Sequence, residues 1–138
     1  MSGLEVIGAL AAASQVAQQG LKITTAIYDL SKKVRDAPES IRKQTIQVEQ
    51  LIDIAKLIES NPSLQTDLVA SVLSGCTEEA YKLLHILQKL THSLGADRTT
   101  SVWKAMSGVA KEKKILEHLA KLEKAKTTLA LCIETVDR

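Results

Sequence analysis

The histidines, the cysteines and one glutamate pair are the residues of this sequence whose chemistry could support a reaction. His85 and His92 are seven residues apart, so on a helix they share a face but lie about two turns from each other. Histidines that bind one metal ion from a single helix are about three or four residues apart. His118 is distant from both, and we therefore predict no metal site.

The thiols and carboxylates do not form a catalytic group either. Cys76 is close to Glu78 and Glu79, whose negative charges raise the pKa of a thiol and make it less reactive. Adjacent residues such as these two glutamates do not converge on one substrate from a helix. Cys76 and Cys132 lie in apolar rows, so we expect two small buried residues in a reducing compartment. The sequence predicts no catalytic residue, no cofactor and no enzyme activity.

A lysine-rich stretch near the C-terminus is the first feature that points to a partner. Residues 104–126 contain seven lysines and three glutamates, an excess of four positive charges. One interpretation is a solvated outer helix face. The other is contact with anionic lipid head groups, since each lysine near such a surface contributes about 1 kcal/mol. Lys111, Lys113 and Lys114 are the candidate lipid contacts. The formal net charge of +2 and the few aromatic residues argue against nucleic-acid binding.

The stretch from Leu4 to Val34 is the second feature, and we expect the fold to be organised around it. No charged residue occurs from Val6 to Leu21. A row of apolar or small residues recurs at alternating spacings of three and four, which places the row on one face of a helix. This row contains Val6, Ala9, Ala13, Val16, Gly20, Ile23, Ile27, Leu30 and Val34. A second row is expected to widen the same face, and it contains Leu4, Ile7, Ala11, Leu21 and Tyr28.

Such an apolar helix either forms the middle of a bundle or engages a membrane. Polar residues from Ser14 to Gln19 interrupt the run, so no stretch reaches the ~18 apolar residues that a membrane-spanning helix needs. Small residues recur at four-residue spacing, as in Ala9 and Ala13, which allows a second helix to approach closely. We expect residues 23–34 to form core and residues 3–20 to move, with Gly20 as a weak point between them. The candidate membrane or oligomerisation residues are Leu4, Val6, Ile7, Gly8, Leu10 and Ala13.

The sequence as a whole predicts one all-α domain over residues 1–138, which forms a single bundle of about five helices. Prolines, glycines and capping residues place the helices at about 3–35, 38–58, 62–73, 77–94 and 101–136. Ser74-Gly75 is either a stop or a kink, and the last segment is either one helix or two joined near Gly108. Ser60 or Asn61, and Thr77, are the expected N-caps. Further core residues are expected at Leu83, Leu87, Leu119, Leu122 and Leu129.

Three stretches together resemble a known family. They are the apolar opening from Gly3 to Ala11, the junction from Val34 to Pro38, and a closing segment in which Trp103 precedes a lysine-rich run. The closing segment continues with Leu119, Leu122, Glu123, Lys126, Thr127, Thr128, Leu129 and Leu131. The chain resembles the N-terminal helical domains of fungal NACHT and other STAND (NLR-like) proteins, the SesA and HeLo-like group.

This resemblance implies a non-enzymatic signalling or execution domain. A nucleotide-binding oligomerisation domain is then expected to follow Arg138, and the absence of a capping signal at the chain end agrees with a longer protein. HeLo-like domains oligomerise, expose the N-terminal helix, target the plasma membrane and promote programmed cell death in heterokaryon incompatibility or innate immunity. Glu5 and the glutamines of the opening helix depart from a strong membrane-toxin pattern.

Two hypotheses follow. In the first, the domain acts in cell death by self-association and membrane engagement through residues 3–21, moving from the cytoplasm to the plasma membrane on activation. In the second, it is a soluble helical adaptor whose opening helix stays buried and whose outer face recruits a partner protein. Removal of residues 2–20 would unfold the adaptor but would leave most of the helicity of the execution domain.

Overall fold

The computed structural model describes the backbone of residues 2–34, 37–92, 103 and 108–137, and the side chains of residues 8–34, 37–92, 103 and 110–135. All regular structure in these ranges is helical, which confirms the all-α prediction. The predicted end of a helix near residue 94, the residues between it and the last predicted helix, and the side chains of Leu4, Val6 and Ile7 lie outside the described residues.

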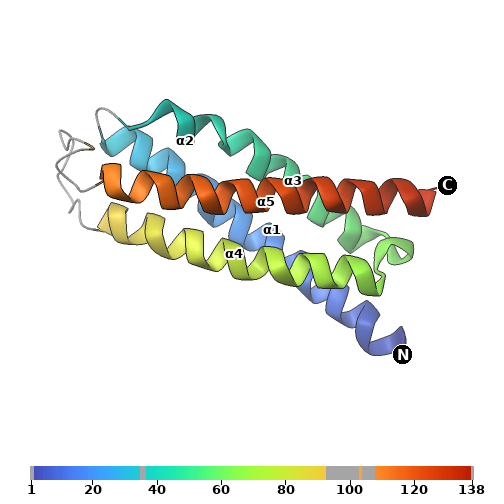
Figure 1. Ribbon diagram of the computed structural model, residues 1–138. Coiled ribbons are helices and arrows are strands. Elements are labelled where there is room, and N and C mark those ends of the chain that lie inside the picture. Colours follow the sequence, from blue (N-terminus) through green and yellow to red (C-terminus); the bar gives the residue numbers. More distant parts are fainter. Residues whose placement is uncertain (1, 35–36, 93–102, 104–107, 138) are drawn as a thin grey trace.

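Four long helices form the bundle (Figure 1). They are α1 (Ser2–Lys33), α3 (Thr45–Ser60), α4 (Asp67–His92) and α5 (Gly108–Asp137). The short helix α2 (Glu39–Lys43) precedes α3, and a 3-10 turn, η1 (Pro62–Leu64), joins α3 to α4.

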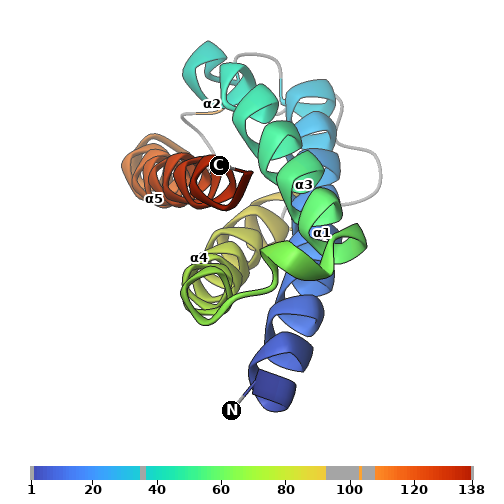
Figure 2. The same cartoon turned by 90° about the vertical axis from the view of Figure 1, so that its right-hand side faces the viewer.

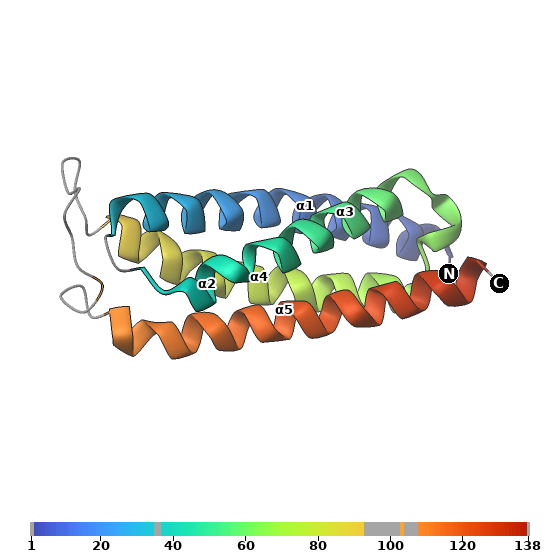
Figure 3. The ribbon, with the colours of Figure 1, turned by 90° about the horizontal axis from the view of Figure 1, so that it is seen from above.

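The long helices stand at the corners of a square. Both α1 and α5 pack against α3 and α4, so α1 and α5 occupy opposite corners (Figure 2). Helices α1 and α4 run in one direction, and α3 and α5 run in the other (Figure 1). The start of α1 and the end of α5 therefore lie at the same end of the bundle (Figure 3).

The core lies between these helices and is aliphatic. Every residue predicted for it is buried, and buried rows from all four long helices extend it. Trp103 is also buried, at 3% exposure. The predicted core residues found buried are Ile23, Ile27, Leu30, Val34, Leu83, Leu87, Leu119, Leu122 and Leu129.

The predicted stop at Ser74-Gly75 is wrong, because α4 is continuous from Asp67 to His92. The predicted N-cap, Thr77, lies inside this helix and its Oγ1 donates to the Leu73 carbonyl at 3.0 Å. The observed cap is Thr66, whose Oγ1 accepts a hydrogen bond from the Val69 amide at 3.2 Å. Buried residues on both sides of exposed Gly75 keep the helix packed, and this packing overrides the weak helix propensity of glycine.

Two smaller boundary predictions also need correction. The expected helix at 38–58 is divided at Gln44, where the Thr45 hydroxyl donates to the Arg42 carbonyl at 2.8 Å. Ser60 and Asn61 do not cap the following helix. Their side chains donate to the Leu57 carbonyl at 3.1 and 3.2 Å. They therefore provide hydrogen-bond donors for a carbonyl at the C-terminal end of α3.

Candidate functional site

The front half of α1 (residues 3–20) and its back half (residues 23–34) bury different kinds of side chain. The front half buries small or polar residues, and Val16 is the largest aliphatic one among its described side chains. The back half buries Ile23, Ile27, Leu30 and Val34, each at most 2% exposed. Over residues 8–20, α1 is therefore more weakly packed than over its back half. The buried residues of this described part are Ala9, Ala13, Val16, Ala17, Gln19 and Gly20.

The predicted position of the second row of α1 is wrong. Ala11, Leu21 and Tyr28 do not widen the buried face but are exposed, with Leu21 at 52% and Tyr28 at 60%. Leu10 is 42% exposed. The two rows differ because the contacts of α1 with α3 and α4 cover only part of its circumference. From residue 8 to residue 21 this outer face contains no charge, and its exposed residues are Gly8, Leu10, Ala11, Gln15, Gln18 and Leu21.

Gln19 is the polar residue in the buried face of α1. Its side chain is 6% exposed, and the buried Oε1 accepts no hydrogen bond from the described residues. An unsatisfied buried acceptor costs about 1–3 kcal/mol. This cost is removed when the front half of α1 separates from the bundle, because water then hydrates the amide.

Gly20 marks the closest approach of α1 to α3. A Cβ atom at this position would lie 2.5 Å from Cγ1 and 3.0 Å from Cδ1 of Ile52, closer than van der Waals contact allows. Gly8, by contrast, has open space around it. Helix α1 continues through Gly20, so this glycine is a site of close packing between two helices.

No helix within the described ranges is long and apolar enough to cross a bilayer.

The candidate lipid contacts lie far from the front half of α1. Lys113 and Lys114 are exposed and Lys111 is half-buried, all in the first turns of α5. These turns stand at the opposite end of the bundle from the start of α1 and on the opposite corner (Figures 1 and 2). In the folded bundle the two groups are therefore separated along its long axis.

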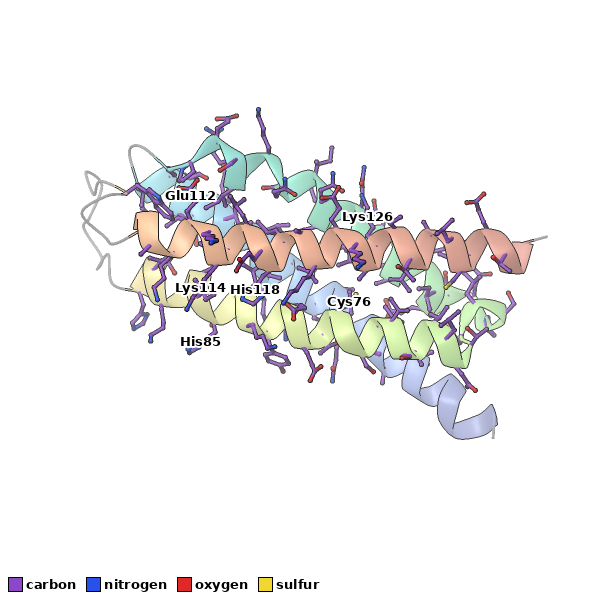
Figure 4. All side chains as sticks on the ribbon, in the orientation of Figure 1. Cys76, His85, Glu112, Lys114, His118 and Lys126 are labelled. Carbon is purple, nitrogen blue, oxygen red and sulfur yellow. The ribbon has the colours of Figure 1, made fainter. Side chains whose placement is uncertain are left out.

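Two other lysines of the same stretch hold helices together. Lys126 on α5 donates through Nζ to Oε1 of Gln47 and to Oε1 of Gln50, the latter at 2.7 Å, and so joins α5 to α3 (Figure 4). Lys121 lies 3.9 Å from the Glu79 carboxylate on α4. Part of the lysine-rich face is therefore structural.

The sequence did not predict the contact between Glu79 and His118. His118 Nδ1 lies 2.7 Å from Glu79 Oε1, and both side chains are less than one-fifth exposed. Burial raises the pKa of the Glu79 carboxyl, but the His118 hydrogen bond and the charges of Lys121 and Lys82 outweigh burial, so the pKa is lowered. The two residues are 39 positions apart, and no local pattern could have paired them. Glu79 lies inside α4 and ties α4 to α5 through His118.

The remaining chemistry-bearing residues do not converge. Burial raises the pKa of the Cys76 thiol to about 12, which makes it a poor nucleophile, and Cys76 and Cys132 are both free. His85 and His92 are exposed on α4, and His85 points away from α5 (Figure 4). Among the described side chains, no group of three or more His, Cys, Asp and Glu could hold a metal ion.

Comparison with known proteins gives one match. Residues 6–129 match the family model SesA, described as the N-terminal domain on NACHT NTPases and P-loop NTPases. Searches of curated proteins and of solved structures return no match. The matched residues include α1, α3 and α4 and most of α5, and thus nearly the whole bundle. The chain therefore belongs to the SesA family of N-terminal domains on NACHT and P-loop NTPases.

Proposed function

We propose that this domain is a non-enzymatic signalling and execution module of a fungal NLR-like protein. It promotes regulated cell death, in incompatibility or defence, by self-association and by membrane engagement through the front half of α1. A nucleotide-binding oligomerisation domain follows it in the full-length protein and drives its clustering. The domain resides in the cytoplasm and reaches the plasma membrane on activation. Its family membership supports the effector role.

The observation that carries the membrane step is the pairing of weak packing with an uncharged outer face in residues 8–20 of α1. A fully buried large aliphatic side chain contributes about 1.5–3 kcal/mol. The back half of α1 buries four such side chains, whereas the described part of the front half buries only Val16. Separation of the front half is therefore much less costly than separation of the whole helix.

The distance between α1 and the α5 lysines sets the order of events. The two groups lie at opposite ends of the closed bundle, and in this proposal α1 leaves first and its front half reaches the bilayer. Lys111, Lys113 and Lys114 meet anionic lipid only after this rearrangement. The front half lies in the membrane interface with its leucine side toward the acyl chains.

The experiment is a leakage assay on this chain, clustered by a fused trimerisation domain, with dye-filled vesicles that contain anionic lipid. We expect Leu4→Glu, Ile7→Glu and Leu10→Glu each to reduce leakage at least tenfold, because each charge would have to enter the bilayer interface. Leu131→Glu is the matched control, since Leu131 is 59% exposed on α5. If the three α1 variants leak like the parent chain, the membrane role is wrong.

The second candidate function is an adaptor that recruits a partner without membrane activity. Its support is the complete burial of Ala9 and Ala13, which makes the front half part of the fold. Circular dichroism of a chain that lacks residues 2–20 separates the two functions. The adaptor predicts cooperative loss of helicity at 25 °C, and the execution module predicts that α3, α4 and α5 stay helical.

A further inference from the structure

The two ends of the bundle carry opposite charge. We compare the half that contains the end of α1 (residues 18–34, 39–52, 80–92 and 110–122) with the half that contains its start (residues 8–17, 53–79 and 123–135). The first, called the basic half, has eleven Lys or Arg and five Asp or Glu among these described residues. The second, called the acidic half, has three Lys and seven Asp or Glu. A chain with a net charge of +2 thus consists of halves with excesses of six positive and four negative charges.

Helix direction produces this separation. The basic residues lie at the ends of α1, α2 and α4 and at the start of α5, and the bundle brings these four segments to one end (Figure 1). The acidic residues lie at the end of α3, the start of α4 and the second half of α5, which meet at the other end. The front half of α1 adds no charge to the acidic half over residues 8–17.

Most of these charges face solvent and lack an ion-pair partner. In the described part of the chain, Glu39 pairs with Arg42 at 3.4 Å, and Glu79 pairs with Lys82, Lys121 and His118. Lys126 and Glu112 are hydrogen-bonded to side chains of other helices, and the other charges remain available to another molecule. The exposed ones include Lys32, Lys43, Lys89, Lys113 and Lys114 in the basic half, and Asp53, Asp67, Glu78 and Glu134 in the acidic half.

We propose that the partner of each charged half is the opposite half of a second copy of this chain. Charge complementarity on one molecule supports this partner, since each copy carries both surfaces. Contacts between unlike halves are attractive, whereas a parallel side-by-side pair places like charges together and is repelled. This proposal rests on the proposed function and deepens its self-association step, and the charges that it names lie outside the uncharged outer face of α1 over residues 8–21.

Such an association is weak and sensitive to salt. Exposed ion pairs contribute about 0–1 kcal/mol each, and salt screens them beyond a Debye length of about 8 Å at 0.15 M. We therefore expect sedimentation velocity at roughly 0.02 M salt to show association that weakens at least tenfold by roughly 0.5 M salt. A chain that is monomeric, or equally associated, at both salt concentrations would overturn the proposal.

Charge reversal tests the surfaces. Lys113→Glu with Lys114→Glu lowers the excess of the basic half from six positive charges to two, and we expect at least a tenfold loss of self-association. Glu78→Lys with Glu134→Lys removes the excess of four negative charges from the acidic half and has the same effect. A mixture of the two variants regains association, because the unchanged acidic half of the first variant meets the unchanged basic half of the second.

The matched control changes the net charge of the chain by the same amount as Lys113→Glu with Lys114→Glu. Lys56→Glu with Lys124→Glu alters two exposed lysines in the acidic half, and this variant keeps or increases its self-association. If it loses association like Lys113→Glu with Lys114→Glu, net charge and not the position of the charge is responsible, and the proposal is wrong. If the basic half binds vesicles of anionic lipid while the mixture fails to associate, the partner is a lipid surface and the proposal is again wrong. The leakage assay uses a chain clustered by a fused trimerisation domain and does not depend on these charge contacts, so failure here is separable from failure of the membrane step.

Discussion

The front and back halves of α1 lie in the same helix, against the same two neighbours, but their contacts differ in kind. The back half fills the core with large aliphatic side chains, and the front half offers alanines, one valine, a glycine and an unsatisfied glutamine. Small residues allow close approach but bury little apolar area. One helix can therefore combine an anchored segment with a segment that separates at moderate cost. The following substitutions test this contrast.

The largest effect is expected from Leu30→Ala in the back half. Leu30 is 1% exposed, and truncation of such a leucine costs about 2–5 kcal/mol in unfolding free energy. Val16→Ala in the front half should cost less, because fewer buried methyl groups are lost. Urea denaturation measures both. Equal losses would show that the two halves are packed equally well.

Gly20→Ala tests the contact between α1 and α3. The new methyl group would displace Ile52, and we expect a loss of about 1–3 kcal/mol despite the better helix propensity of alanine. Gly8→Ala is the matched control. Open space surrounds Gly8, so this substitution should be neutral or slightly stabilising. A stable Gly20→Ala chain would mean that α1 and α3 separate readily at this point.

Gln19→Met should increase the free energy of unfolding, whereas Leu30→Ala and Gly20→Ala should decrease it. Methionine has a similar shape and removes the unsatisfied acceptor, so thermal unfolding should show a gain of about 1–2 kcal/mol. Hydrogen exchange should slow in the front half, and vesicle leakage should fall because α1 separates less often. Gln18→Met, at an exposed position, is the control and should change neither stability nor exchange. No change in exchange with Gln19→Met would mean that Gln19 does not weaken the front half.

The smallest effect concerns pH and the contact between α4 and α5, away from α1. The pKa of Glu79 is lowered from its ordinary value of 4.5 on folding. Its contribution to the stability of the fold is therefore present above pH 4.5 and is lost as the pH falls through the lowered pKa of the folded state. The parent chain should exceed Glu79→Gln in stability at pH 7, and the difference should shrink below pH 4.5. Urea melts at several pH values measure this difference. A constant difference would show that the charge of Glu79 contributes nothing.

Much of the fold could be predicted, because long helices depend on periodicity. The 3-4 spacing from Ile23 to Val34 and from Leu83 to Leu87 identifies a buried face, and both rows are buried. Boundaries were less predictable. Gly75 lies inside α4, because packing on either side of it outweighs its low helix propensity. The N-cap of α4 is Thr66 and not Thr77, although both are threonines that could cap a helix.

The candidate site was predictable only in part. An apolar row predicts that a face exists but not which part of it another helix covers, so Leu21 and Tyr28 were assigned to the wrong side. The pairing of Glu79 with His118 depends on how α4 and α5 are aligned, and local spacing contains no information on that alignment.

The sequence by itself determined the helical class, the apolar rows, the uncharged opening helix and the family. These properties depend on residues close together in the chain, where helix geometry relates spacing to direction. Only the tertiary structure decided which face of α1 is exposed, where Gly20 meets α3, and how far the α5 lysines lie from the start of α1. It also separated the charges, because the alternating directions of the helices gather basic segments at one end and acidic segments at the other.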